Sequence, residues 1–168
     1  TVTHLSAACG SLSWALWEKI KYGKASLVGI VTGTIAGLAS ITPASGFVGP
    51  LEAVIIGTIS GILCQESVNL VRNYLRIDDT LDVFAVHGIG GIFGTIMIAV
   101  FNTLGFINGA SWLSQLGSIV IVGFYTLVVT VIIIKLLNLF IPLRVSREVE
   151  SEGLDLRIHG ERAYDFTS

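Results

Sequence analysis

Long runs of apolar residues, separated by short polar connections, occupy most of this chain up to residue 142. A helix needs about 20 predominantly apolar residues to cross a hydrocarbon core that is roughly 30 Å thick, and the runs have about this length. The pattern therefore predicts an all-α fold, a polytopic bundle of membrane helices. Five transmembrane helices are expected, at about 1–17, 25–42, 51–71, 81–101 and 116–142.

The first and last of these spans differ from the ideal length. The first is slightly short for a full crossing, so we expect that it begins before Thr1 and that this sequence is part of a longer protein. The last is longer than a perpendicular helix needs, so we expect it to tilt or to kink. Residues 143–168 are polar and mixed in charge, which is typical of a tail outside the membrane.

Composition supports the membrane class and excludes several others. Hydrophobic residues make up 52% of the chain and charged residues 13%, whereas about a quarter of a soluble domain is charged. The net charge of −2 gives no reason to expect a nucleic-acid partner. Cys9 and Cys64 lie within apolar runs and are interpreted as small buried side chains. With no nucleophile elbow, phosphate loop or paired carboxylates in the sequence, we expect no enzyme, metal or cofactor.

The basic residues of the connections lie in every second one. The first such connection contains Lys19, Lys21 and Lys24, the next contains Arg72 and Arg76, and Arg144 and Arg147 follow the last span. The other two connections, about 43–50 and 102–113, contain neither Lys nor Arg. By the positive-inside rule, the N-terminal end is expected outside the cell and the tail in the cytoplasm.

A histidine lies well inside the fourth predicted span. Along a helix, His87 would stand roughly 9 Å beyond Leu81. Ionisable groups at such a depth usually face a protein interior or a pore, so His87 is a candidate functional residue. The alternative is a structural histidine that forms a hydrogen bond to a neighbouring helix.

Small and hydroxyl-bearing residues recur along the spans. Glycine ridges let membrane helices approach each other closely, although some glycines could instead shape a pore. Thr32 and Thr42 could bind a translocated solute, but threonine commonly bonds the backbone of its own helix. The ridge of the second span consists of Gly29, Gly33 and Gly37.

Acidic residues gather just before the fourth span. Asp78 and Asp79 are expected to cap that helix or to pair with Arg76. Asp82 is expected in the first turn, where a carboxylate favours the positive helix end. Glu52 has the same interpretation at the start of the third span, the alternative being that it attracts a cation.

Three motifs of this chain match one known family, in the family's own order. Thr42-Pro43-Ala44-Ser45-Gly46 is followed by Asp78-Asp79-x-x-Asp82-Val83-Phe84-x-Val86-His87-Gly88-x-x-Gly91. The tail runs from Leu143-Arg144-Val145 through Glu152-Gly153-Leu154-Asp155 to His159-Gly160-Glu161-x-Ala163-Tyr164. These motifs resemble the loop after the eighth helix, the signature and the regulatory C-terminal region of the ammonium transporter family (Amt/Mep, related to Rh proteins).

The resemblance implies that the chain is helices seven to eleven of an eleven-helix, homotrimeric, channel-like transporter of the plasma membrane. Helices one to six would be missing from this sequence. The implied function is transport of ammonium or ammonia through a narrow hydrophobic pore lined by a histidine pair, of which this chain supplies one. A P-II-type cytoplasmic regulator is implied as a further partner. The alternatives are an Amt-like ammonium sensor that signals through its tail and a merely structural bundle.

Particular residues take their expected roles from the resemblance. His87 matches the second pore histidine, Val83 a pore-lining residue one turn earlier, and Thr32 and Thr42 hydroxyl-bearing pore positions. The first pore histidine, the outer aromatic cation site and the phenylalanine gate would lie on helices one to six. Structural or regulatory roles are implied for Asp79, Asp82, Gly153, Asp155, His159, Gly160 and Tyr164.

The tail itself has two interpretations. Its charge content is compatible with a disordered segment. Leu154, Leu156 and Ile158, together with two aromatic residues further on, supply apolar side chains for docking on the cytoplasmic face. We expect the docked arrangement.

Overall fold

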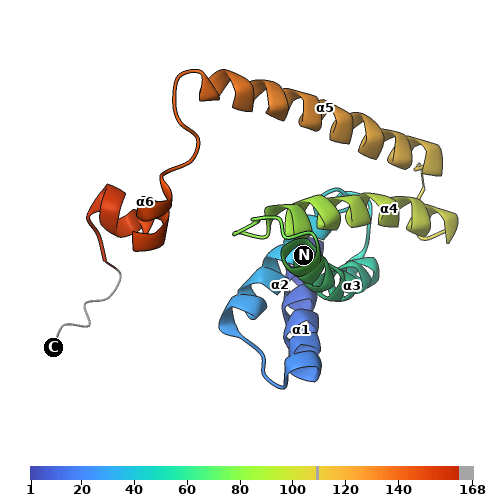
Figure 1. Cartoon of the computed structure of the whole chain (residues 1–168). Coiled ribbons are helices and arrows are strands. Elements are labelled where there is room, and N and C mark those ends of the chain that lie inside the picture. Colours follow the sequence, from blue (N-terminus) through green and yellow to red (C-terminus); the bar gives the residue numbers. More distant parts are fainter. Residues whose placement is uncertain (109, 163–168) are drawn as a thin grey trace. The chain divides into compact units, whose positions relative to one another are not determined.

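The computed structural model describes residues 1–108 and 110–162, and these residues form helices and no strand (Figure 1). Each predicted span corresponds to one long helix, so the all-α prediction is confirmed. The long helices are α1 (Val2–Tyr22), α2 (Leu27–Ile41), α3 (Pro50–Asn69), α4 (Ile89–Thr103) and α5 (Trp112–Asn138). Shorter elements are α6 (Arg147–Glu152) and the π-helical turns η1 (Leu70–Tyr74), η2 (Phe84–Gly88) and η3 (Asp155–His159).

Three helical stretches of the described chain are long and apolar enough to cross a membrane. They are Pro50–Tyr74, Phe84–Thr103 and Trp112–Asn138. Helix α2 is equally apolar but has 15 residues, whereas α1 has 21 residues and carries charged side chains near its end. These helices are those of a multi-pass membrane protein.

Several helix boundaries differ from the predicted spans. Helix α2 begins at Leu27 and not at residue 25, because Ser26 caps it and accepts a hydrogen bond from the Gly29 amide at 2.9 Å. The last span runs from Trp112 to Asn138 and not from 116 to 142. The fourth helix begins after Asp82 and not at Leu81, so the prediction that Asp82 lies in its first turn is wrong. The backbone of Asp82 is left-handed, with φ 54°, which is incompatible with an α-helical turn.

The helices α1, α2 and α3 pack closely through glycines. A Cβ atom at Gly37 or at Gly57 would collide with the backbone of Ser6, and one at Gly94 on α4 with the backbone of Ser40. The Ser6 hydroxyl donates a hydrogen bond of 2.8 Å to the Gly37 carbonyl across the contact of α1 with α2. Packing is therefore the role of these glycines in the described chain.

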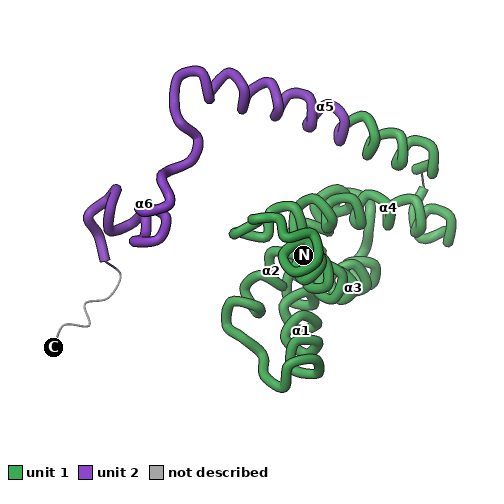
Figure 2. The backbone as a smooth tube through the Cα atoms, viewed as in Figure 1, with its two compact units in different colours: residues 1–121 green, residues 122–168 purple. Residues whose placement is uncertain are grey.

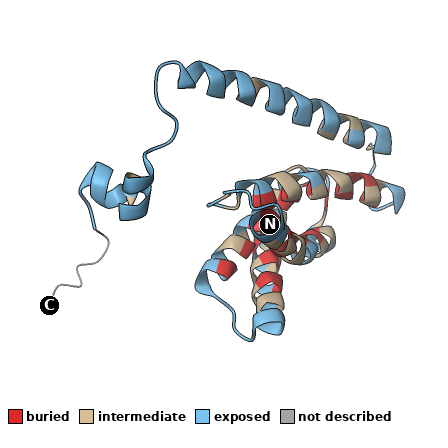
Figure 3. Cartoon of the chain, in the orientation of Figure 1, coloured by how far each residue is buried: buried red, intermediate tan, exposed pale blue. Residues whose placement is uncertain are grey.

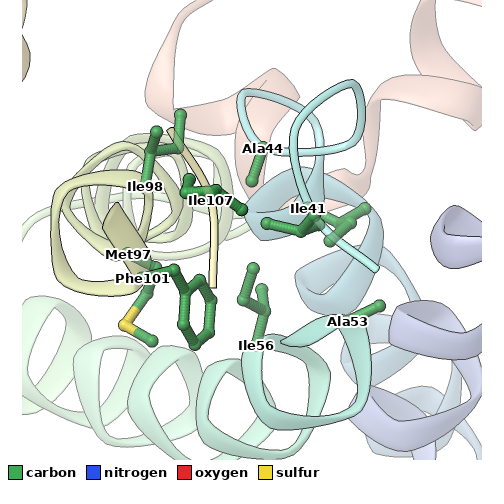
Figure 4. Close-up of a cluster of buried hydrophobic side chains, with 9 residues drawn as sticks. Ile41, Ala44, Ala53, Ile56, Met97, Ile98, Phe101 and Ile107 are labelled. Atoms are coloured by element: carbon green, nitrogen blue, oxygen red, sulfur yellow. The ribbon is translucent and has the colours of Figure 1, made fainter. Parts of the chain in front are cut away.

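Apolar side chains from α2, α3 and α4 meet in one buried cluster (Figure 4). Ile41 and Ile56 are fully buried, and Phe101 is 2% exposed. The Phe101 ring also meets Phe106 edge to face, with the ring centroids 6.2 Å apart. This dense packing fixes α4, the helix that continues from η2, against α2 and α3.

The chain divides into two compact units, residues 1–121 and residues 122–168 (Figure 2). The first unit holds α1 to α4 and the beginning of α5. The second holds the rest of α5, followed by α6 and η3. Buried residues are found in α1 to α4, whereas α5 has none (Figure 3).

Candidate functional site

The segment that carries His87 begins with a side-chain cap. The carboxylate of Asp79 accepts hydrogen bonds from the backbone amides of Val83 at 2.8 Å and Phe84 at 2.9 Å. The prediction that Asp79 caps this helix is confirmed. The amide of Val86 then donates to the carbonyl of Asp82 at 2.8 Å, which closes the first helical turn. Residues Phe84–Gly88 follow as the π-helical turn η2.

The two faces of this turn differ in burial. Ala85 and Val86 are buried, and Val86 packs into a cluster with Trp14 and Cys64. Val83 and His87 lie on the exposed side. Among residues 1–108 and 110–162, the His87 side chain makes no hydrogen bond. The structure therefore presents its two ring nitrogens on the outer side of the helix, one turn beyond the exposed side chain of Val83.

The threonines of the predicted pore lie in or next to α2, a helix that packs against η2 and α4. Thr42, which is exposed, donates its hydroxyl to the Leu38 carbonyl at 2.7 Å. Such a hydroxyl still has lone pairs to accept a hydrogen bond. Thr32 is half-buried, and its side chain makes no hydrogen bond within the described part of the chain.

A second polar contact of this region involves Arg72 in η1. Its guanidinium Nε lies 2.7 Å from the carboxylate Oδ1 of Asp82, and its Nη2 donates to the Thr80 carbonyl at 2.9 Å. Burial raises the pKa of the Asp82 carboxyl, an effect that the nearby Arg72 opposes. Sequence reasoning considered Arg76 as the basic partner in this connection and did not consider the pair of Arg72 with Asp82. A possible signal was that both residues stand next to predicted helix ends on one side of the membrane.

The end of α1 is joined to the end of α3 by a polar contact that the sequence did not suggest. Trp17 donates its indole N–H to the Glu66 carboxylate at 2.6 Å, and the ammonium of Lys21 lies 2.6 Å from the same oxygen. The contact links two helices whose ends lie on the same predicted face.

The predicted regulatory residues lie in the second unit. Gly153 has φ 99° and ends α6, and Gly160 has φ 67° and ends η3. Positive φ at both positions favours glycine. Asp155 and His159 are the first and last residues of η3. Tyr164 lies outside the described residues.

The fold and the long apolar helices are those of a multi-pass membrane protein. The sequence model of the Ammonium Transporter Family matches residues 1–164. The chain therefore belongs to that family, as its three motifs indicated.

Relatives and solved structures agree with this assignment. An ammonium transporter of Bacillus subtilis is 42% identical over 172 residues, covering 96% of this chain and 43% of the relative. The ammonium transporter Amt1 of Archaeoglobus fulgidus is 40% identical over 171 residues, covering 97% of this chain and 43% of the relative. The chain thus spans less than half the length of these relatives, whose names are those of transporters and not of enzymes.

Two solved structures share the fold. The crystal structure of Candida albicans Mep2 is matched with a TM-score of 0.74 and 34% identity, over 88% of this chain and 36% of that one. A structure named Sensor Amt Protein is matched with a TM-score of 0.80 and 29% identity, over 92% of this chain and 40% of that one. Both matches support the membership of this chain in the ammonium transporter family.

Proposed function

We propose that the polypeptide to which this chain belongs transports ammonium or ammonia across the plasma membrane, and that His87 lines its pore. The observation that carries the proposal is the exposed position of His87 on a membrane helix whose opposite face is packed. An ionisable side chain at that depth requires a polar or proteinaceous neighbour. In the proposed transporter this neighbour is a second histidine, on helices outside this sequence.

Histidine suits the chemistry of such a pore. Carrying an ammonium ion through an apolar conduit is costly, and the cost falls if the proton is separated from the ammonia. A pair of neutral imidazoles can accept hydrogen bonds and donate them along the path, because each ring has two distinct nitrogens. Val83, Thr32 and Thr42 are proposed to line the same conduit.

The assembly and orientation of the transporter follow the same proposal. The chain supplies helices seven to eleven of eleven, in a homotrimer whose C-terminal tail is cytoplasmic. The basic residues of alternate connections support this orientation. The tail, with Asp155 and His159 in η3, is proposed to dock on the cytoplasmic face, where a P-II-type regulator would act on it.

A sensor is the second candidate function. The similarity to a Sensor Amt Protein, at a TM-score of 0.80 over 92% of this chain, supports it. A sensor would bind ammonium and move its tail without sustaining uptake. Measured uptake therefore separates the two functions.

The test is to replace His87 in the complete transporter, expressed in cells that lack their own ammonium uptake. His87→Ala is expected to abolish uptake or to alter its selectivity, because the pore loses an imidazole, while the amount of protein in the membrane changes little. The matched control is His4→Ala, which removes the exposed histidine of α1 and should leave uptake unchanged. Unchanged uptake by the His87→Ala variant would contradict the proposed role.

A further inference from the structure

Two π-helical turns flank the connection between α3 and the helix that carries His87. The turn η1 ends at Tyr74, and η2 begins at Phe84. Between them, Arg76 and Asp82 have left-handed backbones, with φ 52° and 54°. A left-handed conformation is costly for residues other than glycine and least so for Asp and Asn. Contacts in the surrounding structure are therefore needed to hold this connection in place.

Arg72 provides such contacts from η1. Its guanidinium binds the Asp82 carboxylate through Nε, at 2.7 Å, and the Thr80 carbonyl through Nη2, at 2.9 Å. The two acceptors lie close together in the sequence, and one planar guanidinium reaches both. The Asp82 side chain is only 15% exposed, compared with 45% for that of Arg72. An ion pair with a largely covered carboxylate is screened less by water than one in open solvent.

The residues held by Arg72 set where the next helix begins. The carbonyl of Asp82 accepts the amide of Val86 at 2.8 Å, which is the first backbone bond of that helix. Asp82 therefore takes part in two contacts: its backbone carbonyl forms the first hydrogen bond of the helix, and its side chain forms the ion pair with Arg72. Moving the Asp82 carboxylate would therefore move the first turn, which contains Val83.

Because η2 is π-helical, the direction of the side chains before it depends on how the first turn is held. A π-turn contains one more residue than an α-helical turn of the same length. Each α-helical residue turns the chain by about 100°. If η2 relaxed to a regular α-helix, the residues before it, Val83 among them, would rotate by about that angle relative to α4. Val83 would then point in a different direction relative to α4, which would change the position of its side chain beside that of His87.

We propose that Arg72 is a positioning residue for the transport site: by binding Asp82 and the Thr80 carbonyl, it holds the start of η2 so that Val83 and His87 face the conduit together. This inference rests on the proposed function of His87. It assigns to a cytoplasmic arginine a role in the properties of the pore. Arg72 itself does not touch the substrate.

The proposal is tested by transport kinetics in the complete protein, with ammonium as the substrate and with rates expressed per transporter in the membrane. Arg72→Met is expected to change the apparent KM by up to about fivefold, the factor that corresponds to the roughly 1 kcal/mol of a partly exposed ion pair. Arg72→Lys keeps the positive charge but loses the planar guanidinium that reaches both acceptors. Its KM should therefore lie between those of the wild type and Arg72→Met. A merely structural role would lower the number of folded transporters and the maximal rate, and would leave KM unchanged.

The double variant of Arg72→Met with Asp82→Asn, compared with the two single variants, tests whether the ion pair with Asp82 causes the change in KM. Asparagine tolerates the left-handed backbone of position 82, so this change removes the charge and keeps the local fold. If the ion pair is the cause, Asp82→Asn alone should change KM in the same direction as Arg72→Met, and the double variant should have the KM of Arg72→Met, because the two substitutions remove one interaction. If Asp82→Asn alone keeps the wild-type KM, the ion pair is not the cause. Arg76→Gln, which removes a charge from the same connection, is the control and should keep the wild-type KM.

The outcomes separate this inference from the proposed function. If the wild-type protein shows no ammonium uptake, the proposed function fails and the inference fails with it. If the wild type transports and His87→Ala alters uptake, but Arg72→Met and Arg72→Lys both keep the wild-type KM, the proposed function stands. In that case the positioning role of Arg72 is overturned.

Discussion

Single residues decide the geometry next to the candidate site, and Asp82 is the clearest case. The backbone of Asp82 is left-handed, and its largely covered side chain forms an ion pair with Arg72. The pKa of this carboxyl is raised above the ordinary value of an aspartate, mainly by burial, with Arg72 acting in the opposite direction. A raised pKa means that the folded protein binds the proton more tightly than the unfolded chain does. Protonation of Asp82 therefore favours the folded state.

The pH dependence of stability follows from that sign. In the window above pH 3.8, stability is expected to fall as the pH rises through the folded-state pKa of Asp82, and to be recovered on acidification. Asp82→Asn cannot titrate, so the wild type should gain thermal stability relative to this variant between about pH 7 and about pH 4. Thermal unfolding of both proteins in detergent measures the difference. An equal response of the two proteins to pH would contradict the assignment to Asp82.

At the scale of elements, close approach of helices explains most of the small residues. Gly94 of α4 faces the backbone of Ser40, whereas Gly91, less than one turn away, has open space in the described chain. These two glycines look alike in the sequence. Only the position of α2 distinguishes them.

The matched substitutions Gly94→Ala and Gly91→Ala test this distinction. A methyl group at position 94 would force α4 away from α2, and overpacking of this kind typically costs about 1–3 kcal/mol. Gly94→Ala is expected to lower the thermal unfolding temperature of the complete transporter in detergent, and Gly91→Ala to change it far less. Equal effects of the two substitutions would mean that the contact of α4 with Ser40 does not limit the packing.

At the scale of the whole molecule, the central prediction is orientation in the membrane. Basic connections are retained on the cytoplasmic side, so residues at the ends of α1, η1 and α5 should be inside. Single-cysteine labelling, in a background without Cys9 and Cys64, measures this in intact and permeabilised cells. Positions 21, 76 and 144 should be labelled only after permeabilisation, and positions 45 and 108 in intact cells. Protection of position 108 in intact cells would reverse the assigned orientation.

The sequence by itself determined the class of protein, the location of the helices and the candidate histidine. These properties are local, because a membrane span is recognised from the apolar residues within it and an orientation from the basic residues beside it. The cap of Asp79 was also predictable, since a capping side chain acts within a few residues of its own position. The motifs around Thr42, His87 and Gly153 identified the family.

Only the tertiary structure decided how the residues around His87 are held. The pairing of Arg72 with Asp82, the left-handed backbone at Asp82 and the π-helical turn η2 have no local signature in the hydrophobic pattern. The same is true of the burial of Val86 against Trp14 and Cys64, which leaves His87 on the opposite, exposed face. Each of these features depends on contacts between helices that are distant in the chain, and such contacts are set by packing and not by the composition of any one segment.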